Sequence, residues 1–169
     1  WVKLGMAYYK KGEASRAVEA YENALEIQPN NLEALNNLGM AYDELGRFEE
    51  AITAYQSALK ISPEHAQLQV NLSVAQNLKA GKYSLKAYRD YRRGRDSVAG
   101  GKIDTAIAEW KKAIADSPNY TQAYLNLAEA YFNQSRYSTA IEFYTKAGQL
   151  DRDNPQIFYN LGNAHQRLG

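Results

Sequence analysis

The sequence predicts an all-α fold in which antiparallel pairs of helices stack on one another along the chain. Helix pairs are predicted because apolar and small residues recur every three or four positions, and glycine or proline stands where each helix must end. Stacking is predicted because the pattern has a period of about 34 residues, and a unit of that size cannot bury its apolar face alone. Such a unit must pack on copies of itself. The repeat relates Trp1, Leu4, Gly5, Tyr8, Ala17, Tyr21, Ala24 and Pro29 to Leu35, Leu38, Gly39, Tyr42, Ala51, Tyr55, Ala58 and Pro63.

Each unit contains signals for the ends of its two helices. Gly46 lies between the two apolar runs of the second unit, and the chain is expected to turn there because glycine takes a positive φ without steric cost. Pro63 lacks an N–H group and disfavours helix at Ser62, so the second helix is expected to end near Ile61. Each helix is therefore expected to have about four turns.

Small residues are expected where the two helices of a pair approach closely. Gly39 and Ala51 occupy such positions in the second unit, and Tyr55 is expected to fill the space beside them. Trp110 occupies the corresponding large position in a later unit, so we expect its ring in the core.

The period divides the chain unevenly, although we expect a single array over residues 1–169. Arg152 stands where the proline of the fifth repeat is expected, and the chain starts and stops within a repeat, so we expect a fragment of a longer protein. The predicted parts are 1–31 (repeat 1, partial), 32–65 (repeat 2), 66–99 (an irregular first helix and a linking basic helix), 100–120 (the second helix of the next repeat), 121–154 (a repeat) and 155–169 (the first helix of a further repeat).

The period fails in the third of these parts. A first helix begins at Ala66, and one full repeat later the next unit would begin at Gly100. The next matching unit begins at Ala87 instead, so more than a third of a repeat is missing. One helix is therefore skipped, and a kink or a change in direction of the array is expected. A stretch missing from the sequence itself is the alternative explanation.

Residues 84–99, which lie in this irregular part, have two interpretations. As a second helix, they carry Ala87, Tyr91 and Gly94 at the small, aromatic and small positions, two residues late. Side-chain chemistry favours that interpretation. As a first helix, they place Gly94 at the glycine position of the repeat, and the count to Pro118 favours this.

The residues that carry the period resemble the tetratricopeptide repeat family, whose signature is W-x2-L-G-x2-Y…A-x3-F…P. Residues 1–8, WVKLGMAY, match its first half, and Ala51–Tyr55 and Ala106–Trp110 match its middle with an aromatic residue in place of Phe. The resemblance implies a right-handed superhelical solenoid, here with a half-repeat irregularity around residues 81–100. It also implies a concave groove lined by the first helices, and the binding of a partner protein or peptide.

Composition limits the classes of function. The chain is 45% hydrophobic, which suffices for a core between two helical layers, and it has no cysteine, which excludes disulfides and cysteine metal sites. No apolar run approaches the roughly 20 residues that a bilayer span needs. No signal peptide is visible, and a cytoplasmic location is expected, although targeting signals could lie outside this fragment.

Positive charge is concentrated at the break in the period. Residues 79–95 contain seven Lys and Arg residues and one aspartate, which gives this segment a charge of about +6. The rest of the chain therefore has a charge of about −5, since the net charge is +1. Such a field favours an acidic partner. The alternative is a solvated helix face beside acidic neighbours from other repeats.

Little in the sequence indicates catalysis. His65 and His165 stand in repeats that are far apart along the chain, and none of the common nucleotide, hydrolase or zinc motifs is present. We therefore expect no enzyme activity, no metal and no cofactor. Tyr88 and Tyr91 alternate with arginines as in nucleic-acid sites, but tyrosines at helical spacing usually form core, so nucleic-acid binding is not expected.

The groove is the better candidate site. The resemblance implies that defined positions of each first helix face it, and asparagine recurs at the sixth: Asn37, Asn71, Asn126 and Asn160. An asparagine amide can donate and accept at once, so a row of them can bind an extended peptide backbone. This resembles the asparagine ladder of superhelical tetratricopeptide arrays, although Lys3 and Arg92 interrupt it. A structural role for these asparagines is the alternative.

The sequence thus predicts a non-catalytic scaffold that binds a partner peptide or helix in its groove. Apolar groups are expected to form pockets, and arginines to favour acidic side chains. Alternatives are a self-assembling, homo-oligomeric module and the substrate-recognition arm of a larger enzyme. The residues predicted to line the groove are Asn37, Met40, Val70, Asn71, Arg92, Arg95, Leu125, Asn126, Phe132, Tyr159 and Asn160.

Overall fold

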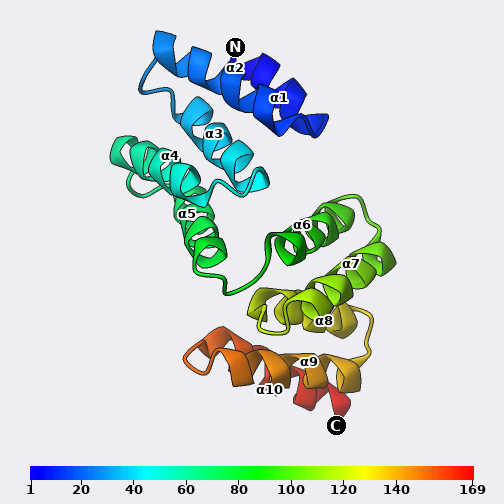
Figure 1. Cartoon of the computed structure of the whole chain (residues 1–169). Coiled ribbons are helices and arrows are strands. Elements are labelled where there is room, and N and C mark those ends of the chain that lie inside the picture. The colour runs from blue at the N-terminus through cyan, green and yellow to red at the C-terminus, as the bar shows by residue number, and fades with distance from the viewer. The chain divides into compact units, whose positions relative to one another are not determined.

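The computed structural model describes residues 1–169 as ten α-helices joined by short turns, with no β-strand (Figure 1). It divides into two compact units, Trp1–Gly81 and Lys82–Gly169. The predicted all-α solenoid of helix pairs is confirmed, whereas a single array over residues 1–169 stays a prediction. The helices are α1 (Val2–Lys10), α2 (Ala14–Ile27), α3 (Leu32–Glu44), α4 (Phe48–Ile61) and α5 (Ala66–Lys79) in the first unit, and α6 (Leu85–Ala99), α7 (Ile103–Asp116), α8 (Thr121–Asn133), α9 (Tyr137–Leu150) and α10 (Pro155–Leu168) in the second.

In the pairs α1/α2, α3/α4 and α6/α7, a glycine of the first helix lies against an aromatic ring of the second. A Cβ atom added to Gly39 would lie 2.5 Å from the Tyr55 ring, and one added to Gly94 would lie 2.3 Å from the Trp110 ring. Gly5 meets Tyr21 in the same way. The glycine and the ring have the same sequence separation in all three pairs. The predicted close approach is therefore confirmed, and in these three pairs it requires glycine because a methyl group has no space.

The turn inside each pair has one backbone geometry. Gly12, Gly46 and Gly101 have φ values between 72° and 80°, and Ser135 takes the same place with φ 60°. The N–H of the next residue donates to the carbonyl five residues earlier, as Arg47 does to Tyr42 at 2.9 Å, which satisfies a helix carbonyl that would otherwise lack a partner. The predicted turn at Gly46 is confirmed.

The end of each second helix is equally uniform. Gln28, Ser62, Ser117 and Asp151 follow α2, α4, α7 and α9 and share φ near −135° and ψ near 85°. Proline follows the first three of them and disfavours helix at the residue before it. The predicted end of α4 at Ile61 is confirmed.

The glycine–ring contact and the turn geometry identify the helices on either side of the break in the period. α6 packs on α7 as the other first helices pack on their second helices, with Gly94 on Trp110 and the turn at Gly101 in their usual places. The first-helix interpretation of residues 84–99 is therefore correct, and the second-helix interpretation is wrong. α5 packs on α4 and has no second helix of its own.

Side-chain polarity explains how α5 can lack a partner. At the three positions where α3 buries Leu35, Gly39 and Tyr42 against its neighbours, α5 carries Gln69, Ser73 and Gln76, and all three are exposed. In helical repeat arrays, a polar outer face of this kind belongs to a capping helix. α5 therefore caps the first unit.

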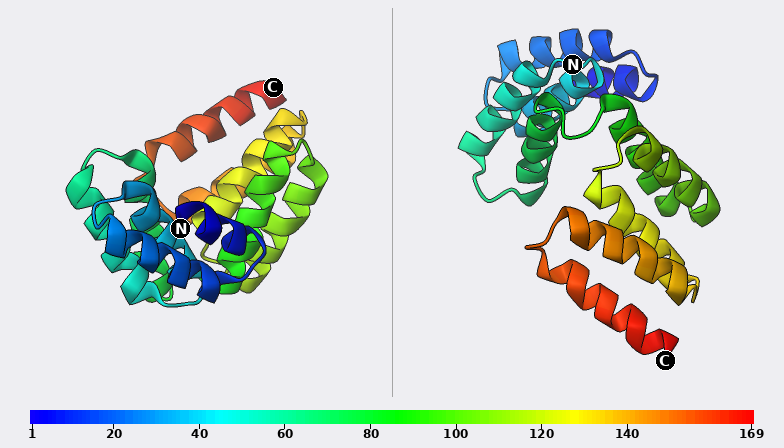
Figure 2. Two further views of the ribbon diagram at one scale, coloured as in Figure 1. Left: turned by 90° about the horizontal axis from the view of Figure 1, so that it is seen from above. Right: turned by 60° about the horizontal axis from the view of Figure 1, so that its bottom comes forward.

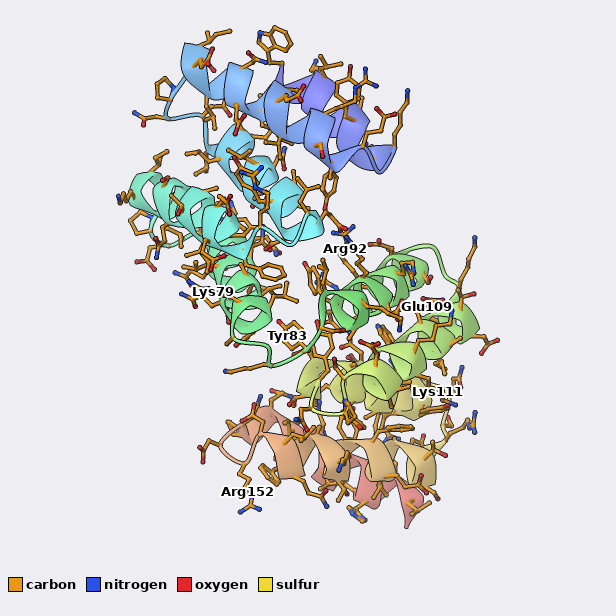
Figure 3. The ribbon with its side chains drawn as sticks, viewed as in Figure 1. Lys79, Tyr83, Arg92, Glu109, Lys111 and Arg152 are labelled. Atoms are coloured by element: carbon orange, nitrogen blue, oxygen red, sulfur yellow. The ribbon has the colours of Figure 1, made fainter.

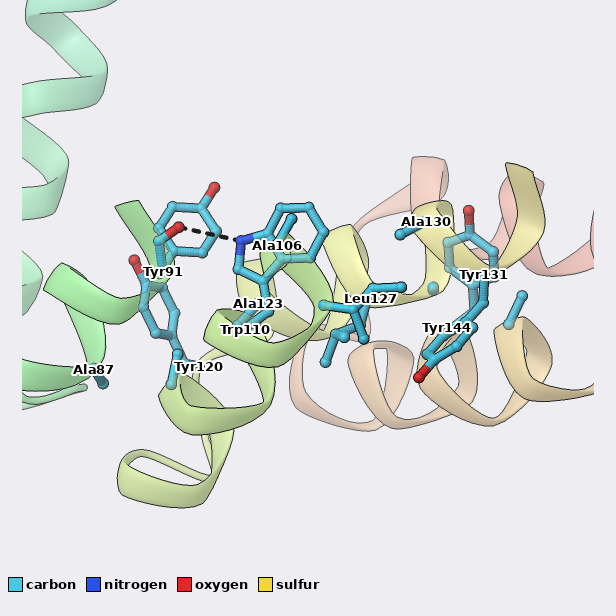
Figure 4. Packing of buried hydrophobic residues seen from close by; sticks show 14 of the residues in the cluster. Ala87, Tyr91, Ala106, Trp110, Tyr120, Ala123, Leu127, Ala130, Tyr131 and Tyr144 are labelled. Carbon is cyan, nitrogen blue, oxygen red and sulfur yellow. Dashed lines mark hydrogen bonds between the residues drawn. The ribbon is translucent and has the colours of Figure 1, made fainter. Parts of the chain in front are cut away.

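Each unit buries its own core between its helices. The helices within a unit alternate in direction (Figure 2). In the second unit, Trp110 is 3% exposed and its Nε1–H donates to the Tyr91 carbonyl oxygen at 3.1 Å (Figure 4). The prediction that Trp110 belongs to the core is confirmed. None of the helices is both long and apolar enough to cross a membrane.

Candidate functional site

All of the predicted groove residues lie on first helices. In the first unit, Asn37 and Met40 belong to α3, and Val70 and Asn71 belong to α5. In the second unit, Arg92 and Arg95 belong to α6, Leu125, Asn126 and Phe132 to α8, and Tyr159 and Asn160 to α10. Each unit therefore carries its own part of the predicted groove.

In the first unit, Asn71 is part of an amide network between two helices. Its side-chain nitrogen donates to Oδ1 of Asn36 on α3 at 2.9 Å, and its own oxygen accepts from Gln67 at 2.9 Å. Asn36 in turn contacts Oδ1 of Asn37 at 3.4 Å. Asn71 thus connects α5 to α3.

In the second unit, Asn126 takes the equivalent place. It lies against the hydroxyl group of Tyr91 on α6, together with Arg95 and Gln122. Burial raises the pKa of Tyr91, while Arg95, Asn126 and Gln122 oppose that rise because they stabilise the phenolate. Tyr91 precedes Asn126 by 35 positions, as Asn36 precedes Asn71.

The other two asparagines differ in this respect. The residues 35 positions before Asn37 and Asn160 are Val2 and Leu125, which cannot accept a hydrogen bond from an amide. The side-chain oxygen of Asn160 accepts from Gln156 on its own helix at 2.8 Å. The sixth-position asparagines are therefore of two kinds, one that connects first helices and one that does not.

The predicted apolar groove residues differ in exposure. Val70 and Tyr159 are 51% and 66% exposed. Met40, Leu125 and Phe132 are half-buried and pack against the cores of their units, and Phe132 also meets Tyr137 edge-on at 5.4 Å. Only the first two present most of their surface to solvent.

A pocket of about 410 Å³ opens between α6, α7 and α8 in the second unit. It contains two of the predicted groove residues, Arg95 and Asn126, and its volume lies within the range of small-ligand sites. Sequence analysis missed Trp110 and Ile103 as pocket residues, because both occupy core positions of α7. The pocket is lined by Arg95, Val98, Ile103, Trp110, Asn126, Glu129, Ala130, Asn133 and Gln134.

Part of the basic stretch is neutralised within the fold. Lys86 pairs with Asp116 at 3.0 Å, and Arg93 pairs with Glu109 at 3.0 Å and with Asp90. Glu109 lies on α7 (Figure 3). Lys79 pairs with Glu49 at 3.3 Å in the first unit. Carboxylates on other helices thus form ion pairs with Lys79, Lys86 and Arg93. These pairs agree with the alternative interpretation, in which the basic segment lies beside acidic neighbours.

Arg95 has no carboxylate partner in the structure. It is exposed on α6 and lines the pocket, so among the two arginines predicted to bind acidic groups it is the one with a defined cavity beside it. No three His, Asp or Glu side chains lie together as metal ligands.

Family models identify the repeat directly. Residues 2–66 match a model described as tetratricopeptide repeat, and residues 94–135 and 130–169 match a second model described as TPR repeat. The chain belongs to the tetratricopeptide repeat family. The two family models leave residues 67–93 unmatched. This range contains most of α5 and more than half of α6, where the period fails.

Curated relatives match over part of the chain. Human protein O-mannosyl-transferase TMTC3 is 33% identical over 67 residues, which are 40% of this chain and 7% of that protein. A DnaJ homolog subfamily C member 7 homolog of Dictyostelium discoideum is 33% identical over 63 residues, 37% of this chain and 12% of that protein. The matched segments span less than a fifth of either relative.

Solved structures of similar fold include other tetratricopeptide arrays. A crystal structure of MamA has 23% sequence identity and a TM-score of 0.47, covering 92% of this chain and 99% of that one. A structure of the TPR2AB domain of yeast Sti1 in complex with pHSP90 has 21% sequence identity and a TM-score of 0.48. The match covers 97% of this chain and 68% of that one. With TM-scores below 0.5, neither structure bears on the function of this chain.

Proposed function

We propose that this chain is a non-catalytic protein-interaction module whose first helices bind an extended segment of a partner protein. Membership of the tetratricopeptide repeat family supports interaction with proteins as the general role, because its members are typically non-catalytic interaction modules. The observation that carries the finer proposal is the pocket between α6, α7 and α8, which brings Arg95 and Asn126 together.

The chemistry of the pocket suits a peptide. Asn126, Asn133 and Gln134 supply amide groups that can donate to and accept from a peptide backbone. Val98 and Ile103 supply an apolar wall, and Arg95 supplies a planar cation for an acidic side chain. In the first unit, the amide of Asn37 and the exposed Val70 are available to the same kind of segment.

An array of random 15-residue peptides tests this function. The full chain is expected to retain a subset of the peptides, and Asn133→Ala and Arg95→Ala are expected to weaken that retention because both remove groups from the pocket wall. Arg152→Ala is the matched control, since Arg152 is exposed in the turn between α9 and α10 (Figure 3). Retention of no peptide by the unaltered chain, or equal retention by all four proteins, would contradict the proposal.

Self-assembly is a second candidate, and one observation favours it. α10 leaves Phe158 47% exposed and Leu168 53% exposed, and a Cβ atom added to Gly162 would meet nothing within 4 Å. Light scattering at several concentrations tests it: a mass that grows with concentration and falls back in Phe158→Glu supports self-assembly, and a constant 19.0 kDa mass excludes it. The role of a recognition arm in a larger enzyme stays a prediction.

A further inference from the structure

The pocket of the second unit contains one positive and one negative side chain that are not paired with each other. Arg95 projects from α6 and Glu129 from α8, and both line the pocket and are exposed. Nearby charges on α6 and α7 do form ion pairs, such as Lys112 with Glu109. Arg95 and Glu129 form none in the structure, so the pocket has two unneutralised poles of opposite sign.

Two tyrosines mark where these poles lie. Arg95 lies by the buried hydroxyl of Tyr91 on α6, where its charge opposes the rise in the pKa of that tyrosine. Glu129 lies by Tyr144 on α9, where its carboxylate adds to the effect of burial in raising the pKa of the tyrosine to about 12. The two charged groups therefore line the same pocket but have different neighbours. A bound molecule can reach both at once.

One part of the pocket wall is apolar. Val98 and Ile103 contribute aliphatic groups there, and Trp110 contributes the edge of its ring. Long charged side chains bury their methylene stems on such surfaces while their charged ends stay at the polar rim. The wall therefore suits the stem of a lysine or arginine whose charged end meets Glu129.

We propose that this pocket selects a partner segment with an acidic and a basic side chain two residues apart. The proposal rests on the peptide-binding function proposed above and specifies the peptide. Alternate side chains of an extended chain point to the same side and lie about 7 Å apart, so one segment presents both charges to the pocket. The acidic group meets Arg95 and the basic group meets Glu129, and the fixed positions of the two poles select one order of charges along the peptide.

Charge reversal tests the proposal with defined probes. Four sets of N-acetylated, C-amidated nonapeptides carry central Glu-x-Lys, Lys-x-Glu, Glu-x-Glu or Lys-x-Lys. The unaltered full chain is expected to retain one mixed order about tenfold more strongly than either like-charged set, since like charges repel one pole. Arg95→Glu is expected to move the preference to Lys-x-Lys, and Glu129→Arg to Glu-x-Glu. The double variant Arg95→Glu/Glu129→Arg is expected to prefer the opposite mixed order.

Controls separate this inference from the function on which it rests. Arg152→Glu is expected to keep the ranking of the unaltered chain, and circular dichroism checks that every variant is folded. The same ranking in all variants, or retention of none of the four sets by the unaltered chain, overturns the inference. If random peptides are still retained in the broader array, the proposed function stands without this specificity, whereas failure there removes both.

Discussion

The side-chain amide of Asn71 donates a hydrogen bond of 2.9 Å to Oδ1 of Asn36, and this contact joins α5 to α3. The same spacing of 35 positions relates Asn126 to Tyr91, whose hydroxyl it lies against. An asparagine at the sixth position of a first helix thus contacts the preceding first helix wherever that helix carries a polar group 35 positions earlier. Its structural role and its proposed role in peptide binding are separable by comparing the asparagines that have such a partner with those that do not.

Asn71→Ala is expected to lower the free energy of unfolding of the first unit by about 1 kcal/mol. The change removes the hydrogen bond to Asn36, and a half-buried amide loses its partner. Asn37→Ala is the matched control and is expected to change stability little, because the Asn37 amide nitrogen donates to no other group and its oxygen is reached only by the 3.4 Å contact from Asn36. Urea unfolding followed by circular dichroism measures both, and equal losses would contradict a connecting role for Asn71.

Gly94→Ala and Gly162→Ala are expected to change stability in opposite directions. A Cβ atom at Gly94 would lie 2.3 Å from the Trp110 ring, so overpacking is expected to cost about 1–3 kcal/mol. A Cβ atom at Gly162 would meet nothing within 4 Å, and alanine is the better helix former by about 1 kcal/mol. Thermal unfolding of the two variants compares them directly, and a stabilising effect of Gly94→Ala would show that α6 does not approach α7 as described.

The helices and their pairing could be predicted because the signals are local. Gly46 and Pro63 end their helices through backbone chemistry that needs no partner, and α4 ends at Ile61 as expected. Residues 84–99 misled the side-chain argument because Ala87, Tyr91 and Gly94 imitate a second helix. The role of Gly94 depends on Trp110, which follows it at the same spacing as a ring follows the glycine in the earlier pairs. Counting that spacing, rather than matching residue types, identifies the first helix.

The pocket could be predicted only in part. Arg95 and Asn126 were found because their positions on the first helices define the groove. Trp110 and Ile103 were missed because a core side chain can expose one edge to a cavity, and the sequence pattern contains no signal for that. The pairing of Asn126 with Tyr91 did have a signal, since a polar residue stands 35 positions earlier, as it does for Asn71.

Trp110→Ala is expected to lower the free energy of unfolding of the second unit by about 3–5 kcal/mol. The ring is 3% exposed and fills the space beside Gly94, so its loss leaves a cavity. Trp110→Phe keeps an aromatic ring but loses the hydrogen bond from Nε1 to the Tyr91 carbonyl oxygen, and its expected cost is about 1–2 kcal/mol. Guanidinium unfolding followed by circular dichroism measures the two. A near-neutral Trp110→Ala would place the ring outside the core.

Tyr144 is expected to make the second unit less stable as the pH rises from 10 to 12. Burial, with the Glu129 carboxylate as the second cause, raises the pKa of Tyr144 from 10.0 to about 12 in the folded protein, whereas Asn160 opposes the rise. Since the unfolded chain loses this proton first, the stabilising contribution is complete below pH 10 and is lost as the pH approaches 12. Urea unfolding at pH 9, 10, 11 and 12 measures the loss, and Tyr144→Phe is expected to lose less stability over this interval than the unaltered chain. Glu129→Gln keeps the tyrosine but removes the nearby negative charge, which is one cause of its raised pKa. The variant is therefore expected to lose this stabilising contribution over a narrower pH range. Parallel pH profiles for the three proteins would show that Tyr144 ionises equally easily in the folded and unfolded states.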